Sequence, residues 1–233
     1  MQILEFQSPI MFHTSLNPKL WDGDRVQEPV RLQLLATAKH FIDFLKIKDI
    51  PLRDIIITGS NTGYTYTPHS DLDLHIIVDM NAVYSGHELV TQFFDSKRRL
   101  WNNTYDVEMK DIPVEIYVED DDETVEGNAY SLITDQWIER KDKNTQNQYD
   151  DRAVRAKYQY ISREIERYLK QADDAADIQR LMLKLKNYRQ AGLDRRGELS
   201  TENLVFKALR NNGDIAKIEQ RKIDLVNTKL SIK

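Results

Sequence analysis

The segment Ser70–Asp79, SDLDLHIIVD, constrains the fold of this chain more than any other stretch of its sequence. Its apolar and mostly branched residues favour a buried β-strand. Because side chains two positions apart in a strand point to the same face, Asp71 and Asp73 are expected to project together. Two carboxylates held so close repel each other, so the chain has to supply something that neutralises them.

The overall composition narrows the class of protein. The chain has 233 residues, and 33 Lys and Arg against 38 Asp and Glu give a formal charge of −5. This length fits one or two domains, and a mildly acidic total argues against a general nucleic-acid coat protein. The absence of cysteine excludes disulfides and thiolate zinc sites. We see no signal peptide and no apolar run of membrane-spanning length, and therefore expect a cytoplasmic protein with no membrane partner.

The first half of the chain alternates helix and strand signals. Residues 1–25 predict an irregular arm, and Pro29 suits the first turn of the helix that follows. A short strand that ends at Gly59 comes next, followed by the strand with the two aspartates. A helix after Gly86 and two strands joined by a tight turn at 110–113 complete the unit. This order predicts an α/β (α+β) fold with a mixed sheet and flanking helices.

The second half predicts a separate helical domain. An acidic run ends the strand pattern, and four amphipathic helical stripes follow it. We expect Gly192 to end the second of these helices and Asp214 to begin the fourth. The predicted division is an α/β domain with its N-terminal arm over residues 1–120, a linker over 121–149 and a C-terminal helical bundle over 150–233.

Divalent cations would neutralise the two aspartates. Mg²⁺ takes oxygen ligands, usually one or two carboxylates together with phosphate oxygens and water. In a two-metal site the ions clamp the attacking and leaving oxygens of a displacement. Such a site needs a third carboxylate from a neighbouring strand, and Glu115 fits because it alternates with the apolar residues Val114 and Ile116.

A glycine turn precedes the aspartate strand. Gly59 lets the backbone approach a phosphate closely, and free N–H groups together with the Ser60 hydroxyl can hold its oxygens. The predicted constellation is therefore a phosphate-holding turn, two aspartates on one face and a third carboxylate on an adjacent strand. His75 shares the aspartate face and is expected to be a hydrogen-bonded structural residue.

This constellation resembles the polymerase-β-type nucleotidyltransferase superfamily, whose pattern is a strand-ending Gly-Ser, a gap, Asp-apolar-Asp and a later Asp or Glu. The residues that carry the resemblance are Gly59-Ser60, Asp71-Leu-Asp73 and Glu115. Over nearly the whole chain, stretches such as LNPKLW and GELSTENLVFKALRN are also similar to nucleotidyltransferases encoded by tailed bacteriophages. A phage origin would place the protein in the host cytoplasm.

The resemblance implies transfer of a nucleoside monophosphate from an NTP to an acceptor hydroxyl, with pyrophosphate leaving. It makes residues 1–120 the catalytic domain. It also implies two bound Mg²⁺ or Mn²⁺ ions, held by Asp71, Asp73 and Glu115. Gly59 and Ser60 would hold the β- and γ-phosphates. The third carboxylate is Glu here, where Asp is commoner in the superfamily.

Basic residues of the helical domain would complete the nucleotide site. In resembling enzymes such domains reach the triphosphate with cationic side chains, and we expect Lys184 and Lys207 to do so here. The alternative for both residues is an ordinary charged helix surface.

Two other functions stay open at this point. One is a non-catalytic nucleotide-binding regulator or antitoxin-like module on the same fold, although all three carboxylates are present. The other is an oligonucleotide second-messenger synthase, in which the acceptor is another nucleotide. The sequence does not identify the acceptor, which can be RNA, protein, a nucleotide or a small molecule.

Overall fold

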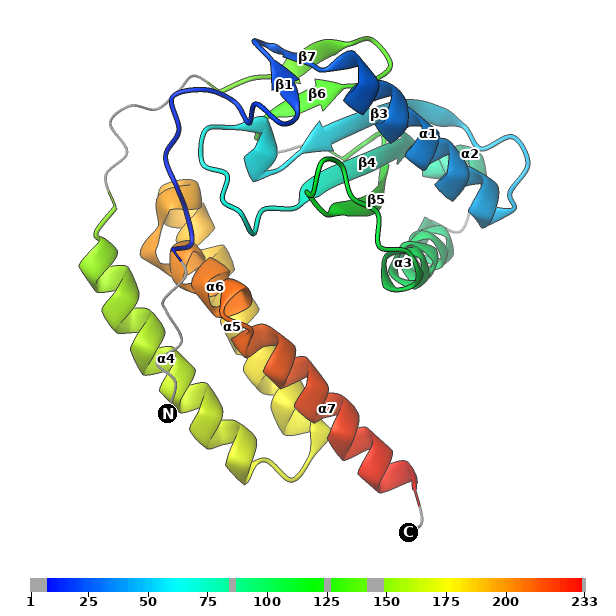
Figure 1. Ribbon diagram of the computed structural model, residues 1–233. Helices are drawn as coiled ribbons and strands as arrows, with labels where there is room; N and C mark the ends of the chain where they lie inside the picture. The colour runs from blue at the N-terminus through cyan, green and yellow to red at the C-terminus, as the bar shows by residue number, and fades with distance from the viewer. Residues whose placement is uncertain (1–7, 84–86, 124–126, 142–148, 232–233) are drawn as a thin grey trace. The chain divides into compact units, whose positions relative to one another are not determined.

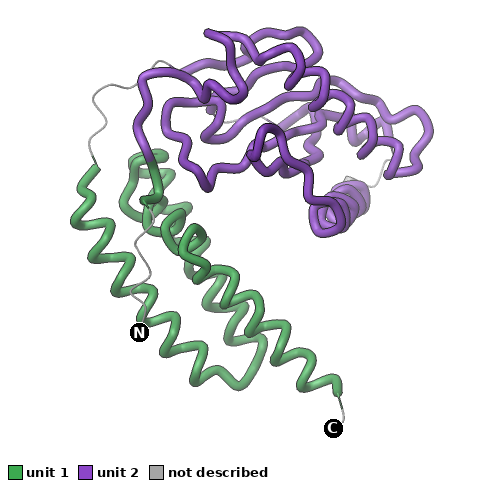
Figure 2. The backbone as a smooth tube through the Cα atoms, in the orientation of Figure 1, with its two compact units in different colours: residues 1–10, 145–233 green, residues 11–144 purple. Residues whose placement is uncertain are grey.

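The structure is a computed structural model, which describes residues 8–83, 87–123, 127–141 and 149–231. It divides into two compact units (Figure 2). Residues 11–144 form one of them, the sheet unit, and residues 145–233 together with residues 1–10 form the other, the helical unit. Each unit has its own hydrophobic core.

A five-stranded mixed sheet lies at the centre of the sheet unit (Figure 1). Its strands are β3 (Leu52–Thr58), β4 (Leu72–Val78), β5 (Val114–Asp120), β6 (Ala129–Ser131) and β7 (Gln136–Glu139). The order across the sheet is β5-β4-β3-β6-β7, with β4 and β5 parallel and the other neighbours antiparallel. A separate two-stranded sheet pairs β1 (Trp21–Asp22) with β2 (Arg25–Val26). The mixed sheet agrees with the predicted α+β class.

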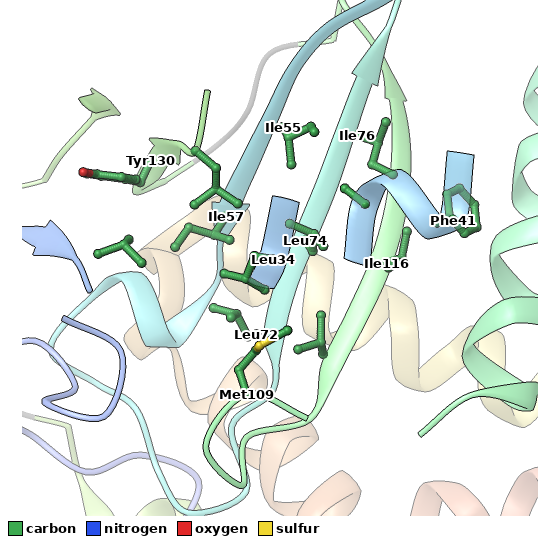
Figure 3. Packing of buried hydrophobic residues seen from close by; sticks show 14 of the residues in the cluster. Leu34, Phe41, Ile55, Ile57, Leu72, Leu74, Ile76, Met109, Ile116 and Tyr130 are labelled. Atoms are coloured by element: carbon green, nitrogen blue, oxygen red, sulfur yellow. The ribbon is translucent and has the colours of Figure 1, made fainter. Parts of the chain in front are cut away.

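The alternation of residues along β4 gives the sheet one apolar and one polar face. Leu72, Leu74 and Ile76 are fully buried, and Figure 3 shows them within the core of the sheet unit. The residues between them, Asp73 and His75, are only partly buried and point to the opposite face, as the two-residue period of a strand requires. The candidate site belongs to this polar face.

Helices pack on the apolar face and connect its strands. α1 (Glu28–Leu45) has Pro29 in its first turn, as predicted. Its residues Leu34 and Phe41 are fully buried among the core residues of the sheet (Figure 3). The chain between β4 and β5 forms α2 (Met80–Val83) and α3 (His87–Thr104).

The segment 121–149, predicted to be a linker, contributes two strands to the sheet. The sheet unit therefore extends to residue 144, beyond the predicted end of the first domain at residue 120. In the part of this range that the structure describes, β6 and β7 form a hairpin, and β6 extends the main sheet by pairing with β3 through Ile57 and Tyr130. Tyr130 is fully buried in the core of the sheet unit. The sequence does not reveal this hairpin because β6 has only three residues, too few for a two-residue period to stand out.

Two further expectations about the sheet unit differ from the structure. Only one full strand, β5, flanks the turn at 110–113, because the segment before the turn forms just an isolated bridge between Glu108 and Pro113. The N-terminal arm is also divided. Its residues 1–10 group with the helical unit, where Ile10 is buried, and its residues 1–7 lie outside the described part of the chain.

Four helices form the helical unit, in agreement with the predicted bundle. They are α4 (Asp151–Gln171), α5 (Ala175–Arg196), α6 (Thr201–Asn211) and α7 (Asp214–Leu230). Asp150, Asp174 and Ser200 cap the first three by accepting backbone N–H bonds with their side chains. No helix in the described part of the chain combines the length and hydropathy that a membrane span requires.

Gly192 does not end a helix, contrary to the prediction. It lies inside α5, where a Cβ atom would stand 2.5 Å from the Cβ of Glu202 and 2.8 Å from the Oγ of Ser200. This glycine therefore lets the start of α6 approach the backbone of α5. The helix ends at Arg196, and Gly197 after it has a φ of 68°, the positive φ expected of a terminating glycine.

Candidate functional site

Asp71, Asp73 and Glu115 converge where β4 and β5 begin. Asp71 immediately precedes β4, and Glu115 is the residue that pairs with Asp73 across the parallel β4–β5 ladder. One carboxylate oxygen from each residue lies within 4.8 Å of the other two. None of the three residues is buried. The structure therefore brings together the three carboxylates that the sequence singled out.

Gly59 makes room for one of these carboxylates. Its φ is 83°, a conformation that residues with a side chain rarely adopt. A Cβ atom at this position would stand 2.1 Å from Oδ2 of Asp73. The Asp73 carboxylate thus approaches the Gly59 backbone closely, and the predicted contact of Gly59 with a phosphate stays a prediction.

Asn61 fixes the turn after Gly59 to the start of β4. Residues Ser60–Thr62 form a 3₁₀ turn, in which Asn61 is 1% exposed. Its Nδ2 donates to the carbonyl oxygen of Asp71 at 2.7 Å, and its Oδ1 accepts from Nδ2 of Asn17 at 2.9 Å. The sequence analysis misses Asn61, because a buried amide in a polar loop leaves no periodic signal.

Ser60 is held by the loop that leads into β4. Its Oγ donates to Oγ of Ser70 at 2.8 Å, and the Ser70 hydroxyl also accepts from the backbone N–H of Thr67 at 2.9 Å. The contact of Ser60 with a nucleotide phosphate stays a prediction.

Tyr117 is a second residue that the sequence analysis misses. It follows Glu115 by two positions on the same face of β5, and its hydroxyl donates to Oε2 of Glu115 at 2.6 Å. Burial raises the pKa of this hydroxyl well above its usual range. The hydrogen bond to Glu115 and the negative charges of Glu115, Asp73 and Asp71 raise the same pKa further. The hydroxyl therefore stays protonated at neutral pH, and the two-residue spacing from Glu115 is the signal that could have revealed it.

His75 is a structural residue, as predicted. Its Nε2 and Oγ1 of Thr58 are hydrogen-bonded at 2.9 Å, and its Nδ1 lies 2.8 Å from Oε1 of Glu119. The side chain is 12% exposed. The imidazole thus links β3, β4 and β5 across the polar face of the sheet.

A cavity of about 310 Å³ lies between the end of α3 and the start of β5. Its walls include Arg99 and Asn103 of α3, Tyr105 from the segment that follows, and Glu115. Glu115 therefore belongs both to the carboxylate cluster and to the wall of this cavity.

Lys184 and Lys207 belong to the other unit. They lie on α5 and α6 of the helical unit, whereas the carboxylates and the Gly59 turn lie in the sheet unit. The contact of these lysines with a nucleotide stays a prediction.

Comparison with known proteins adds little to this picture. No family model matches the chain, and no curated protein matches it. Among solved structures, the STING-associated CdnE c-di-GMP synthase from Capnocytophaga granulosa is similar over 88% of this chain and 83% of its own, with 12% sequence identity and a TM-score of 0.21. A similarity this weak establishes neither the fold nor the family of the chain.

Proposed function

We propose that the protein is a metal-dependent nucleotidyltransferase, which moves a nucleoside monophosphate from an NTP to an acceptor hydroxyl and releases pyrophosphate. One observation carries the proposal: Asp71, Asp73 and Glu115 converge beside the turn that begins at Gly59. The motif resemblance described above points to the same reaction.

The residues of the cluster fit divalent cations such as Mg²⁺ or Mn²⁺. All three offer carboxylate oxygens, within 4.8 Å of one another, and hard cations of this kind take oxygen ligands. When bound, two such ions would offset the charge of the triphosphate and of the attacking and leaving oxygens.

The order of groups across the sheet supports an assignment of the triphosphate and the acceptor to opposite sides of the site. The Gly59 turn follows β3, Asp73 lies on the neighbouring β4, Glu115 lies on β5, and the cavity borders Glu115. In-line displacement requires the acceptor and the leaving group on opposite sides of the phosphorus. We therefore assign the β- and γ-phosphates to the turn that contains Gly59 and Ser60, and the acceptor to the cavity.

The proposed reaction balances without a further reagent. The acceptor oxygen forms a bond to the α-phosphorus, and the bond from that phosphorus to the oxygen bridging the α- and β-phosphates breaks. Pyrophosphate leaves with the bonding electrons, and the acceptor proton passes to a carboxylate, for which Asp73 and Glu115 are the candidates.

The chemistry of the cluster favours catalysis over the non-catalytic alternative. A nucleotide-binding regulator has no need for three convergent carboxylates, whereas phosphoryl-group transfer depends on charge stabilisation by such groups and their cations. A second-messenger synthase is the same reaction with a nucleotide as the acceptor. RNA, a protein and a small molecule are the other acceptor classes.

Label transfer tests the proposal. The protein is incubated with each NTP labelled at the α-phosphate, with Mg²⁺ or Mn²⁺, and with a cell lysate as the source of acceptors. We expect label on one class of lysate component, or on the nucleotide itself, together with an equal amount of pyrophosphate. Labelled inorganic phosphate from a γ-labelled NTP, without transfer of the α-label, would instead identify a phosphatase.

Two variants control the experiment. Asp71→Asn/Asp73→Asn should abolish transfer, whereas Asp49→Asn should leave it unchanged, because Asp49 is an exposed carboxylate in the loop between α1 and β3. If the wild type binds nucleotide but transfers no label in any lysate fraction, the non-catalytic regulator is favoured.

A further inference from the structure

The Tyr117 side chain is held from three directions. Its hydroxyl donates to Oε2 of Glu115 at 2.6 Å. Its ring stacks on the imidazole of His75, with centroids 4.9 Å apart and planes inclined by 17°. The guanidinium carbon of Arg98 lies 4.8 Å from the ring centroid. The phenol therefore has little freedom to leave Glu115.

The neighbours of the ring are themselves fixed. His75 is hydrogen-bonded to Thr58 on β3 and contacts Glu119 on β5. Arg98 donates from Nε to Oδ1 of Asp95 at 2.9 Å, within α3. The Tyr117 ring is thus held through His75 on β4 and Arg98 on α3. Its hydroxyl contacts Glu115, a carboxylate of the cluster.

A hydrogen bond of this type restricts the carboxylate that accepts it. An O–H···O⁻ bond of about 2.5–2.7 Å is among the stronger hydrogen bonds in proteins, and it fixes the rotation of the carboxylate. Groups that hydrogen-bond to ligating carboxylates orient them, and their loss typically lowers metal affinity or activity by about 10–100-fold.

We propose that Tyr117 is a positioning residue, which fixes the Glu115 carboxylate so that the cluster binds a divalent cation. This inference rests on the proposed function. Oε2 accepts from Tyr117, and the carboxylate is thereby held at the distance from Asp71 and Asp73 that the cluster needs.

Direct Mn²⁺ binding tests the proposal without turnover. Electron paramagnetic resonance measures free Mn²⁺ in a titration of the full-length protein, in the absence of nucleotide. Tyr117→Phe keeps the ring between His75 and Arg98 and removes only the hydroxyl. We expect Mn²⁺ to bind this variant about 10–100-fold more weakly than the wild type.

Tyr130→Phe is the matched control. Tyr130 lies in the same unit and is fully buried, and its hydroxyl donates to Oδ1 of Asp135 at 2.7 Å. This variant also loses one tyrosine–carboxylate hydrogen bond, but not one that involves the cluster. It should bind Mn²⁺ like the wild type even if its thermal stability falls.

A double-mutant cycle separates positioning from general damage to the fold. If Tyr117 acts through Glu115, Tyr117→Phe should change Mn²⁺ affinity little in a Glu115→Gln background. An equal loss in both backgrounds, or an unchanged affinity in Tyr117→Phe alone, would overturn the inference and leave the proposed function standing. A wild type that binds no Mn²⁺ in the absence of nucleotide would also overturn the inference, and one that binds none in the presence of NTP either would overturn the proposed function as well.

Discussion

At the scale of single residues, Gly59 is the position of the site that least tolerates a side chain. Its backbone has a positive φ, and the Asp73 carboxylate fills the space of a missing side chain. Any other residue would have to displace the carboxylate or bend the turn. The position of Asp73 in the cluster therefore depends on a glycine fourteen residues before it, in the turn that follows the preceding strand.

Gly59→Ala should weaken both the fold and the cluster. A strained backbone at this position costs about 1–3 kcal/mol, and the contact with Oδ2 of Asp73 adds to that cost. Gly23→Ala is the control, because Gly23 also has a positive φ but no atom lies within 4 Å of its Cβ position. Urea unfolding and Mn²⁺ titration should show larger losses for Gly59→Ala, and equal losses would contradict the assigned contact.

Glu115→Gln should separate nucleotide binding from turnover. The substitution preserves the size of the side chain and removes its charge, and under the proposed function Asp71 and Asp73 would still bind the nucleotide-side cation. We expect NTP affinity to survive largely and transfer to fall about 10²–10³-fold, the scale for loss of one electrostatic stabiliser. Single-turnover kinetics with α-labelled NTP measure this change.

Glu139→Gln provides the comparison for that experiment. Glu139 is an exposed glutamate on β7 of the same sheet, and its substitution should leave transfer unchanged. Near-normal transfer by Glu115→Gln would exclude Glu115 from the reaction, and the free energy of unfolding would then be expected to change by less than about 0.5 kcal/mol.

At the scale of secondary-structure elements, Asn102 protects the edge strand of the sheet. β5 is the outermost strand on its side. Oδ1 of Asn102 accepts from the backbone N–H of Ile116, and Nδ2 donates to its carbonyl oxygen, both at 3.1 Å. The side chain of a helix thus occupies hydrogen-bonding groups that an unprotected edge would offer to another strand.

Asn102→Ala should destabilise the sheet unit and promote self-association. Leaving a buried or partly buried polar group without its partner costs about 1–3 kcal/mol. Asn103→Ala, at the exposed neighbouring position of α3, should change the free energy of unfolding by less than about 0.5 kcal/mol. Urea unfolding and sedimentation velocity measure the two effects, and identical behaviour of the two variants would refute this role for Asn102.

Some secondary-structure elements are easier to predict from the sequence than others. The apolar, mostly branched residues of β4 predict the strand, and the two-residue period of a strand predicts the projection of Asp73. Glu115 follows from the same rule on β5. The β6–β7 hairpin is short, and Tyr130 is buried through long-range pairing with Ile57, which no local pattern encodes. Asn61 escapes for a related reason, because its partners Asn17 and Asp71 lie near it only in the folded unit. Tyr117 differs, because its partner Glu115 is two residues away on the same strand.

At the scale of the whole molecule, the residues predicted to contact the nucleotide are divided between the two units. The three carboxylates belong to the sheet unit, and Lys184 and Lys207 belong to the helical unit. The sequence predicts both groups of residues from different signals, a motif in one case and a charge distribution in the other. The charge distribution selects the lysines, and the resemblance alone implies that they contact the nucleotide.

Lys184→Gln and Lys207→Gln should therefore weaken NTP binding without affecting Mn²⁺ binding. Loss of a hydrogen bond between charged groups, at about 1.5–3 kcal/mol, corresponds to roughly 10–100-fold in affinity. Lys222→Gln, at an exposed position of α7, should leave both affinities unchanged. Calorimetry of the full-length variants measures them, and unchanged NTP affinity in both test variants would remove the helical unit from the nucleotide site.

The grouping of Ile10 with the helical core has a consequence for how the protein is made. Ile10 precedes the sheet unit along the chain, whereas the other buried residues of its core begin at Val154. The sheet unit, residues 11–144, emerges in between and can fold while the rest of the chain is still being made, since domains generally fold as units during synthesis. Ile10 is thus made before the sheet unit but can be buried only after that unit has been made.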